Sequence, residues 1–348
     1  MPAPERVLLV RLSAIGDVVN VLPALTLLRR ALPQAFIGFA VEDRAKDVIV
    51  GHPFVDRVHV FPRRRWREML RRPSPSGWAQ LAREVRAYAR EIRDERYDVV
   101  LDEQSNLKGA VHALASRAPR RIGFARGHDY ELNHLLSTEQ VTPPASRPHR
   151  VDKFVSLLGA LGIDGDAREY VLPHDAAAAE RVRSYLTQSG LGAKAYVVLH
   201  PGTSDHGAEK RWPPERFAAL ARLVGERLGR PVLVTWGPGE EPLAQKVAEL
   251  SGGAARVAPR TESLLELVEL IRGAAVFVSA DTGPMHLAVA AGVTCVALFG
   301  PKDPAIYGPY GAQHVVVRPS GPAANGRSML GIAPEDVFAA VAAKVAPA

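Results

Sequence analysis

The sequence predicts an α/β protein with two Rossmann-like domains, whose parallel sheets face each other across a central cleft. Three observations lead to this prediction. The chain has 348 residues, more than a single ordinary core accommodates. Short β-branched runs alternate with longer amphipathic runs in both halves, an order typical of parallel sheets covered by helices. In each half, an apolar run also leads into a small-residue turn and a helix.

The N-terminal domain is expected at residues 1–165. Its strands are short runs rich in Val, Ile and Phe, and its helices carry apolar residues every three or four positions. The expected strands are Val7–Leu12, Ala35–Ala40, Val58–Phe61, Tyr97–Leu101 and Arg121–Phe124. The expected helices are Val18–Leu32, Ala45–Val50, Trp78–Glu95, Leu107–Ala115 and Val151–Leu161. Residues 162–173 combine Gly, Asp and Pro, which favours a linker.

The C-terminal domain is expected at residues 174–330, with the same alternation. Its strands are predicted at Tyr196–Leu199, Val232–Trp236, Ala274–Val278 and Val293–Leu298. Its helices are predicted at Ala176–Ser189, Pro214–Leu228, Glu241–Leu250 and Leu264–Ile271, with another from His286 onward. Residues 331–348 contain a last helix, Pro334–Val345, which we expect to pack back on the N-terminal domain.

Composition excludes several classes of protein. No apolar run approaches the roughly 20 residues of a membrane span, and residues 1–12 lack the pattern of a signal peptide. The single cysteine, Cys295, excludes an intrachain disulfide framework and reads as a small core residue. We therefore expect a cytoplasmic protein.

The net charge of +7 lies almost entirely in the first half. Residues 1–170 carry 27 Lys and Arg against 21 Asp and Glu, whereas residues 171–348 carry 17 against 16. The densest stretch, residues 63–72, has six arginines and one acid. It is either a solvated helix face or the binding site of an anionic lipid or sugar phosphate. No zinc-finger, helix-turn-helix or RNA-binding pattern occurs, so nucleic acid is not an expected partner.

The segment from Ser279 to His286 follows the apolar run Ala274–Val278 and precedes a helical stretch. A helix that begins at such a turn presents free backbone N–H groups and the positive end of its dipole. Phosphate is the natural ligand of this arrangement. Asp281, Thr282, Gly283 and His286 are therefore candidate phosphate-binding residues, although His286 can equally be a packed core imidazole.

The first strand ends in a similar turn, which offers Ser13, Gly16 and Asp17. Asp17 falls at or just inside a helix N-terminus. The position suits an N-cap carboxylate. It equally suits a general base that takes a proton from an acceptor hydroxyl, because ligands of open α/β sheets gather at the carboxyl ends of the strands. Spacing alone leaves both alternatives open.

Polar groups also follow two strands of the second half. Thr203 and Ser204 can bind phosphate, Lys210 can stabilise a departing diphosphate, and Glu241 can accept bonds from ribose hydroxyls. Lys210 is otherwise an ordinary surface lysine. No His, Asp or Glu cluster has metal-ligand spacing, so we expect neither metal nor cofactor. Neither Gly-x-Gly-x-x-Gly after the first strand nor a P-loop is present, which disfavours a dinucleotide oxidoreductase.

Together these segments resemble glycosyltransferase family 9, the ADP-heptose:lipopolysaccharide heptosyltransferases. The resemblance is collinear over most of the chain. It rests on residues 11–18 with 22–25, 121–124, 202–204 with Lys210 and Trp212-Pro213, 281–287, and 299–304. Two positions depart from the pattern: Ser105 and Gly109 stand where the family leads us to expect Gly and Ser.

The resemblance implies a GT-B fold and inverting sugar transfer without metal. It makes Asp17 the general base and Lys210 the group that neutralises the leaving diphosphate together with Thr203 and Ser204. Glu241 would hold the ribose, and the turn at Asp281-Thr282-Gly283, with His286, would complete the donor site.

The arginine-rich tract looks like the acceptor segment of heptosyltransferase I, which meets Kdo and lipid A phosphates. The acceptor residues implied are Ser13, Gly16, Arg63, Arg64, Arg65, Arg67 and Lys108. The expected partners are ADP-heptose and an anionic lipid-linked acceptor, met in peripheral contact with the cytoplasmic face of the inner membrane. Three alternatives stay open: a family 9 enzyme with another nucleotide sugar, a non-catalytic sugar-nucleotide or lipid-binding protein, and a nicotinamide oxidoreductase.

Overall fold

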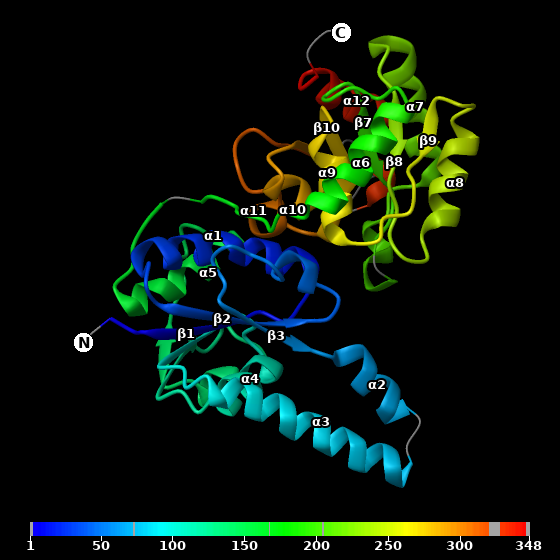
Figure 1. Cartoon of the computed structure of the whole chain (residues 1–348). Coiled ribbons are helices and arrows are strands. Elements are labelled where there is room, and N and C mark those ends of the chain that lie inside the picture. The colour runs from blue at the N-terminus through cyan, green and yellow to red at the C-terminus, as the bar shows by residue number, and fades with distance from the viewer. Residues whose placement is uncertain (1–2, 72–73, 167, 204, 320–327, 346–348) are drawn as a thin grey trace. The chain divides into compact units, whose positions relative to one another are not determined.

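The computed structural model describes residues 3–71, 74–166, 168–203, 205–319 and 328–345. The chain divides into two compact units, residues 1–174 and 175–348 (Figure 1). Each unit is a six-stranded, wholly parallel sheet with helices on both faces. The predicted α/β class and the parallel sheet in each half are therefore confirmed.

The sheet of the first unit has the strand order β3-β2-β1-β4-β5-β6. Its strands are β1 (Arg6–Val10), β2 (Phe36–Glu42), β3 (Arg57–Phe61), β4 (Val99–Asp102), β5 (Arg120–Phe124) and β6 (Glu139–Val141). The two central strands, β1 and β4, pair so that Val10 lies opposite Asp102. The chain thus carries its polar residues to one edge of the sheet, where these strands end.

Two layers of helices cover this sheet (Figure 1). The helices are α1 (Ile15–Ala31), α2 (Arg63–Arg71), α3 (Pro75–Asp94), α4 (Leu107–Ser116) and α5 (Arg150–Ser156), with the 3₁₀ turns η1 (Lys46–Val48), η2 (Asn133–Leu136) and η3 (Leu157–Leu161). Helices α1 and α5 pack together on one face, and α3 and α4 on the other. Leu8 and Val10 of β1 alternate with Val7 and Leu9, so both faces of this strand are buried.

The second unit repeats this architecture with the strand order β12-β11-β10-β7-β8-β9. Its strands are β7 (Val197–His200), β8 (Val232–Val234), β9 (Ala255–Val257), β10 (Val276–Ala280), β11 (Thr294–Leu298) and β12 (Val315–Val317). Its helices are α6 (Ala176–Gln188), α7 (Pro214–Leu228), α8 (Glu241–Leu250), α9 (Leu264–Arg272), α10 (Gly283–Ala290), α11 (Pro304–Tyr307) and α12 (Pro334–Ala342), with 3₁₀ turns at η4 (Asp205–Lys210) and η6 (Met329–Gly331). Cys295 is a buried residue of β11, as predicted.

The C-terminal helix α12 packs against α7 in the core of the second unit. The expectation that residues 331–348 pack back on the N-terminal domain stays a prediction. Val337 and Val341 are completely buried there. The indole N–H of Trp212 donates a 3.1 Å hydrogen bond to the carbonyl of Ile332, just before the helix. These contacts make α12 a covering helix of the second sheet.

Several elements differ in extent from the sequence expectation. The segment expected as a helix at Ala45–Val50 is the 3₁₀ turn η1, and the helix expected at Val151–Leu161 divides into α5 and η3. Three edge strands (β6, β9 and β12) were not predicted. Each has only three residues, too few for alternation to show. Among the described residues, no helix combines the length and apolar character that a membrane span needs.

The packing of α12 predicts that a charge at Val341 destabilises the second unit. Val341→Asp places an unpaired carboxylate in a fully buried apolar position. We expect the free energy of unfolding to fall by at least about 3 kcal/mol. Urea denaturation followed by tryptophan fluorescence measures this change. Lys344→Ala, an exposed change in the following turn, is the control and should alter stability by less than about 0.5 kcal/mol. Equal effects would contradict the packing.

Candidate active site

The predicted base, Asp17, is the third residue of α1, and two arginines fix its carboxylate. Its Oδ2 lies 2.5 Å from Nη2 of Arg11, and its Oδ1 lies 2.5 Å from Nη1 of Arg150. Oδ2 also accepts a 3.4 Å hydrogen bond from the backbone N–H of Ala14, which precedes the helix. Asp17 therefore contributes to the helix N-terminus from inside the first turn and is not the N-cap. Its side chain stays 23% exposed, within reach of a ligand.

Arg11 connects this carboxylate to the interior of the unit. Its guanidinium lies over the ring of Phe154, and its Nη1 donates a 2.5 Å hydrogen bond to the carbonyl of Glu103. Burial lowers the pKa of Arg11, and the attraction of Asp17 opposes this shift. The side chain is only 4% exposed, so Arg11 acts as a fixed charge.

A small pocket opens beside Asp17 within the first unit. Its lining residues are Arg11, Ser13, Asp17, Gln104, Ser105, Asn106, Tyr130, Arg150, Lys153 and Phe154. Three of them are cations, and only one is an acid. Lys153 is held by the carbonyl of His128 at 2.5 Å and lies over the ring of Phe124. The pocket thus combines one carboxylate with an excess of positive charge, which suits an anionic ligand that carries a hydroxyl.

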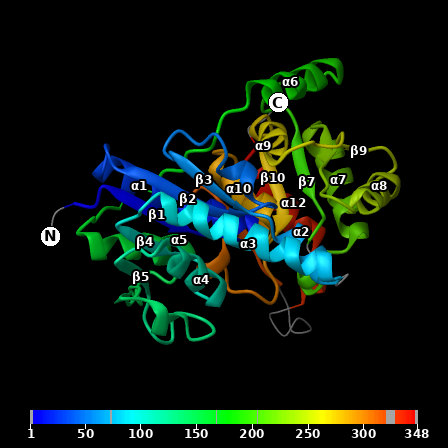
Figure 2. The same cartoon turned by 60° about the horizontal axis from the view of Figure 1, so that its bottom comes forward.

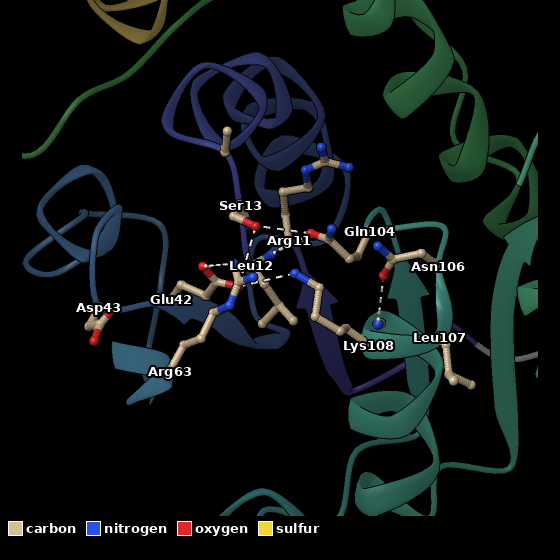
Figure 3. A network of polar contacts seen from close by, with 12 residues as sticks. Arg11, Leu12, Ser13, Glu42, Asp43, Arg63, Gln104, Asn106, Leu107 and Lys108 are labelled. Carbon is tan, nitrogen blue, oxygen red and sulfur yellow. Dashed lines mark hydrogen bonds and ion pairs between the residues drawn. The ribbon is translucent and has the colours of Figure 1, made fainter. Parts of the chain in front are cut away.

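Next to this pocket, Glu42 at the end of β2 joins several groups into one network (Figure 3). Its carboxylate is only 1% exposed and accepts hydrogen bonds from Arg63 (3.1 Å), Lys108 (3.3 Å) and the hydroxyl of Ser13 (3.3 Å). Arg63 and Lys108 remain 46% and 37% exposed. The buried carboxylate therefore holds two exposed cations at a fixed spacing.

The turn between β1 and α1 is fastened from the neighbouring strand. The side-chain oxygen of Gln104 accepts hydrogen bonds from the backbone N–H groups of Leu12 (3.0 Å) and Ser13 (3.2 Å). Gly16 is the buried second residue of α1, one position before Asp17. Ser13 and Gly16 thus lie at the predicted turn.

The predicted arginines of α2 do not all join this site. Arg63 contacts Glu42, but Arg64 pairs with Glu68 at 3.4 Å. Arg65 pairs with Glu84 of α3 at 2.5 Å. Arg67 is exposed and forms no ion pair with any described residue. The tract is therefore an exposed helix of which only the first arginine lies in the Glu42 network.

The structure bears on both departures from the family pattern. Ser105 has a φ of +55°, a left-handed conformation that glycine adopts most easily, and nothing in the structure explains the serine there. A Cβ atom on Gly109 would lie 2.2 Å from Oδ1 of Asp102, so a serine at this position would require the Asp102 side chain to shift. Burial raises the pKa of Asp102 to about 6, although hydrogen bonds from Asn133 and from backbone N–H groups oppose the shift. Asp102 thus organises the loop between β4 and α4.

In the second unit, Lys210 and Asp281 form a close ion pair. The ammonium of Lys210, at the end of η4, lies 2.5 Å from Oδ2 of Asp281, which follows β10. Nε2 of His286 in α10 lies 3.8 Å from the other oxygen, Oδ1. Burial alone would raise the pKa of Asp281, but His286 and Lys210 lower it below its ordinary value. Lys210 is therefore a held cation, and not a free surface lysine.

The same edge of the second sheet carries the other predicted phosphate-binding residues. Thr282 is the N-cap of α10, and its hydroxyl accepts a 3.4 Å hydrogen bond from the N–H of Met285. Gly283 is the first residue of that helix. Thr203, after β7, is buried, and its hydroxyl accepts a bond from Arg211. Ser204 lies outside the described residues.

Two neighbouring carboxylates follow β8 in different environments. Glu241 is exposed at the start of α8 and accepts a 3.4 Å bond from Gln245. Glu240 instead accepts a 2.9 Å bond from the N–H of Gly237 and packs over Gly202, where a Cβ atom would lie 2.0 Å from its carboxylate. Burial lowers the pKa of the adjacent His200 to about 4, so this imidazole is neutral.

Sequence reasoning missed several residues of these sites. Glu42 and Arg150 lie far in sequence from the motifs and reach them only through the fold. Arg11 and Gln104 stand in segments that were noticed, but no spacing rule marks them as functional. Lys153 lies on the same helix as Arg150, and no sequence pattern marked it as functional. Within the described part of the chain, no three His, Cys, Asp or Glu side chains are grouped to hold a metal ion.

The family model described as glycosyltransferase family 9 (heptosyltransferase) matches residues 85–330. Lipopolysaccharide heptosyltransferase 1 of Pseudomonas aeruginosa is 33% identical over 313 residues, which cover 89% of this chain and 82% of that protein.

Solved structures agree with this match. The Escherichia coli heptosyltransferase WaaC with ADP has a TM-score of 0.80 and 27% identity, covering 97% of this chain and 99% of that one. The same enzyme with ADP-2-deoxy-2-fluoro heptose has a TM-score of 0.74 and 27% identity, covering 95% and 97%. The chain therefore belongs to glycosyltransferase family 9 and is a glycosyltransferase with a GT-B fold.

Proposed function

We propose that this enzyme transfers a heptose from ADP-heptose to the Kdo/lipid A inner core of lipopolysaccharide, at the cytoplasmic face of the inner membrane. The names of the relatives support the donor and the pathway, since they are lipopolysaccharide heptosyltransferases and WaaC binds ADP. The observation that carries the proposal is the arginine-held carboxylate of Asp17 beside a cationic pocket.

The transfer is a single displacement with inversion. The acceptor hydroxyl oxygen forms a bond to the anomeric carbon as the bond from that carbon to the diphosphate oxygen breaks. The electron pair of the broken bond leaves with ADP, and the hydroxyl proton passes to the carboxylate of Asp17. Arg11 and Arg150 fix both oxygens of this carboxylate, so little reorganisation is needed when the proton arrives.

The acceptor is bound by the cations around Asp17. Arg63 and Lys108, held by Glu42, offer two positive charges to its carboxylate or phosphate groups. Ser13 and Gly16 form the turn that the acceptor approaches. Further along the exposed α2, Arg64, Arg65 and Arg67 contribute to attraction of the anionic acceptor.

The donor is bound by the second unit. Lys210 and the N-terminus of α10, with Thr282 and Gly283, would stabilise the negative charge that grows on the leaving diphosphate. Asp281 and His286 hold Lys210 in place. Thr203 and Ser204 would add phosphate contacts, and the exposed carboxylate of Glu241 would accept bonds from the ribose. In this scheme the enzyme acts without a metal ion, because these fixed donors supply the charge stabilisation.

The substrate assignment predicts turnover with ADP-heptose. The purified enzyme, a heptose-free Kdo-lipid A acceptor and ADP-heptose should yield an acceptor heavier by one heptose, which mass spectrometry detects. UDP-glucose and ADP-glucose are the comparison donors and should react at least about 100-fold more slowly. Turnover with another nucleotide sugar and none with ADP-heptose would contradict the proposal.

The assignment of the base predicts a large effect of Asp17→Asn. This isosteric amide cannot accept the proton, so kcat should fall by about 10²- to 10⁴-fold. The dissociation constant of ADP, measured by calorimetry, should stay within about twofold of wild type. Asp43→Asn is a matched control, since Asp43 directly follows β2 and its carboxylate accepts a 3.1 Å hydrogen bond from the backbone N–H of Arg64. An unchanged kcat in Asp17→Asn would refute the role.

The lowered pKa of Lys153 leads us to predict that acceptor binding depends on pH. This pKa is lowered to about 8, chiefly by burial and then by the charges of Arg150 and Arg11, while Glu103 and Asp129 oppose the shift. The positive charge is therefore present below pH 8 and is lost as the pH rises through about 8. The KM for the anionic acceptor should then increase about fivefold. Lys153→Arg keeps the charge and should flatten this rise; an identical rise in both enzymes would contradict the assignment.

A further inference from the structure

The first unit exposes an unusual group of apolar side chains. Thirteen large apolar side chains are exposed among the described residues, and six of them lie on α4 or in the segment around η2. We call these six the α4–η2 apolar surface: Leu107, Val111, Leu114, Tyr130, Leu132 and Leu135. Their exposed fractions run from 42% to 68%. By contrast, the described part of the second unit has only Leu250, Val316 and Leu330 in this class.

The two parts of this surface are fastened together. Leu107, Val111 and Leu114 are spaced by four and three residues, so they share one face of α4. Helix α4 packs against η2, and it also packs against α3 (Figure 2). The carboxylate of Glu131 accepts a 3.1 Å hydrogen bond from the N–H of Leu107, and the N–H of Tyr130 donates a 2.8 Å bond to the carbonyl of Ser105. The apolar side chains are therefore displayed from a fixed backbone.

Further bonds hold η2 itself. The side-chain amide of Asn133 donates to Oδ2 of Asp102 at 2.7 Å and to the carbonyl of Asn106 at 2.8 Å. Asn133 is fully buried, whereas Leu132 and Leu135 beside it are the most exposed of the six. The segment thus turns its polar residue inward and its leucines outward. A loop that faces only water normally does the opposite: it exposes its polar side chains and buries its leucines.

Positive charge flanks the apolar side chains. Arg117 follows the last residue of α4, and Arg126 lies in the turn that leads to Tyr130. Both are exposed, and neither forms an ion pair with any described residue. The nearby exposed acid, Glu131, is engaged at the N-terminus of α4. An apolar surface with unpaired arginines at its edges is complementary to an anionic lipid surface.

The surface is continuous with the candidate acceptor pocket. Tyr130 belongs to both, because the residue is 60% exposed and it also lines the pocket of Asp17. Asn106, immediately before Leu107, lines the same pocket. If the α4–η2 apolar surface lay on a bilayer, the sugar of a lipid-anchored acceptor would therefore be close to this pocket.

We infer that the α4–η2 apolar surface docks this enzyme on an anionic lipid bilayer. Its leucines would lie at the boundary between headgroups and acyl chains, and Arg117 and Arg126 would contact the headgroups. The inference rests on the proposed function, since it assumes a lipid-anchored acceptor. A bilayer fits this surface better than a protein partner does. Five of its six side chains are aliphatic and offer no hydrogen-bonding group, whereas protein interfaces carry regular hydrogen bonds.

Vesicle flotation tests the inference directly. The full chain should float with vesicles of phosphatidylglycerol and phosphatidylethanolamine, and much less with phosphatidylcholine alone. The double variant Leu132→Ser/Leu135→Ser should lower the partition coefficient at least about tenfold. Arg117→Glu/Arg126→Glu should lower it on anionic vesicles but not on phosphatidylcholine. Leu250→Ser, an exposed leucine of the second unit, is the matched control and should bind as wild type.

Activity measurements separate this inference from the proposed function. On a deacylated, soluble acceptor the leucine variant should keep its kcat and KM within about twofold, whereas on vesicle-embedded acceptor its rate should fall with the loss of binding. Wild-type binding by the leucine variant would overturn the inference. So would a wild-type dimer that dissociates in this variant, since a second copy would then cover the surface. Absence of heptose transfer by the wild-type enzyme would refute the proposed function and leave the flotation result interpretable by itself.

Discussion

Two carboxylates, Asp17 and Glu42, hold four cationic side chains at the carboxyl edge of the first sheet, and the site depends on this charge compensation. The cations are Arg11, Arg63, Lys108 and Arg150. Without the carboxylates, these cations would repel one another in a partly buried region. With the two carboxylates in place, this group of six side chains keeps a net positive charge and a fixed geometry. A site of this kind attracts an anionic acceptor and needs little rearrangement to bind it.

The second unit also pairs a carboxylate with a cation at the carboxyl edge of its sheet. Asp281 holds Lys210, and His286 lies against the other carboxylate oxygen, so one cation is positioned beside the N-terminus of α10. A held lysine loses less side-chain entropy on binding a diphosphate than a free one. Binding of the donor would compete with Asp281 for the ammonium. Lys210 is thus a positioned cation, and its interaction with a phosphate group can strengthen as negative charge develops on that group.

The sequence allowed the fold class and the turns of the site to be predicted, because both depend on local patterns. Strand–turn–helix junctions are contiguous in sequence, so Asp17 and Thr282 were found from their flanking apolar runs. Glu42 and Arg150 were not predicted, because their roles arise from pairing between strands and helices far apart in the chain. The contact of α12 with α7 was not predicted for the same reason: the apolar face of this helix was evident, but the core that covers it was not.

In the proposed mechanism, Asp17 receives the acceptor proton while Lys210 meets the leaving diphosphate. A crystal structure of this enzyme with ADP-2-deoxy-2-fluoro heptose and a soluble Kdo acceptor would show both contacts. We expect an acceptor hydroxyl within hydrogen-bond distance of a carboxylate oxygen of Asp17, and the diphosphate in contact with Lys210 and the N–H groups at the start of α10. An acceptor hydroxyl directed at a different carboxylate, or a diphosphate bound away from Lys210, would contradict it.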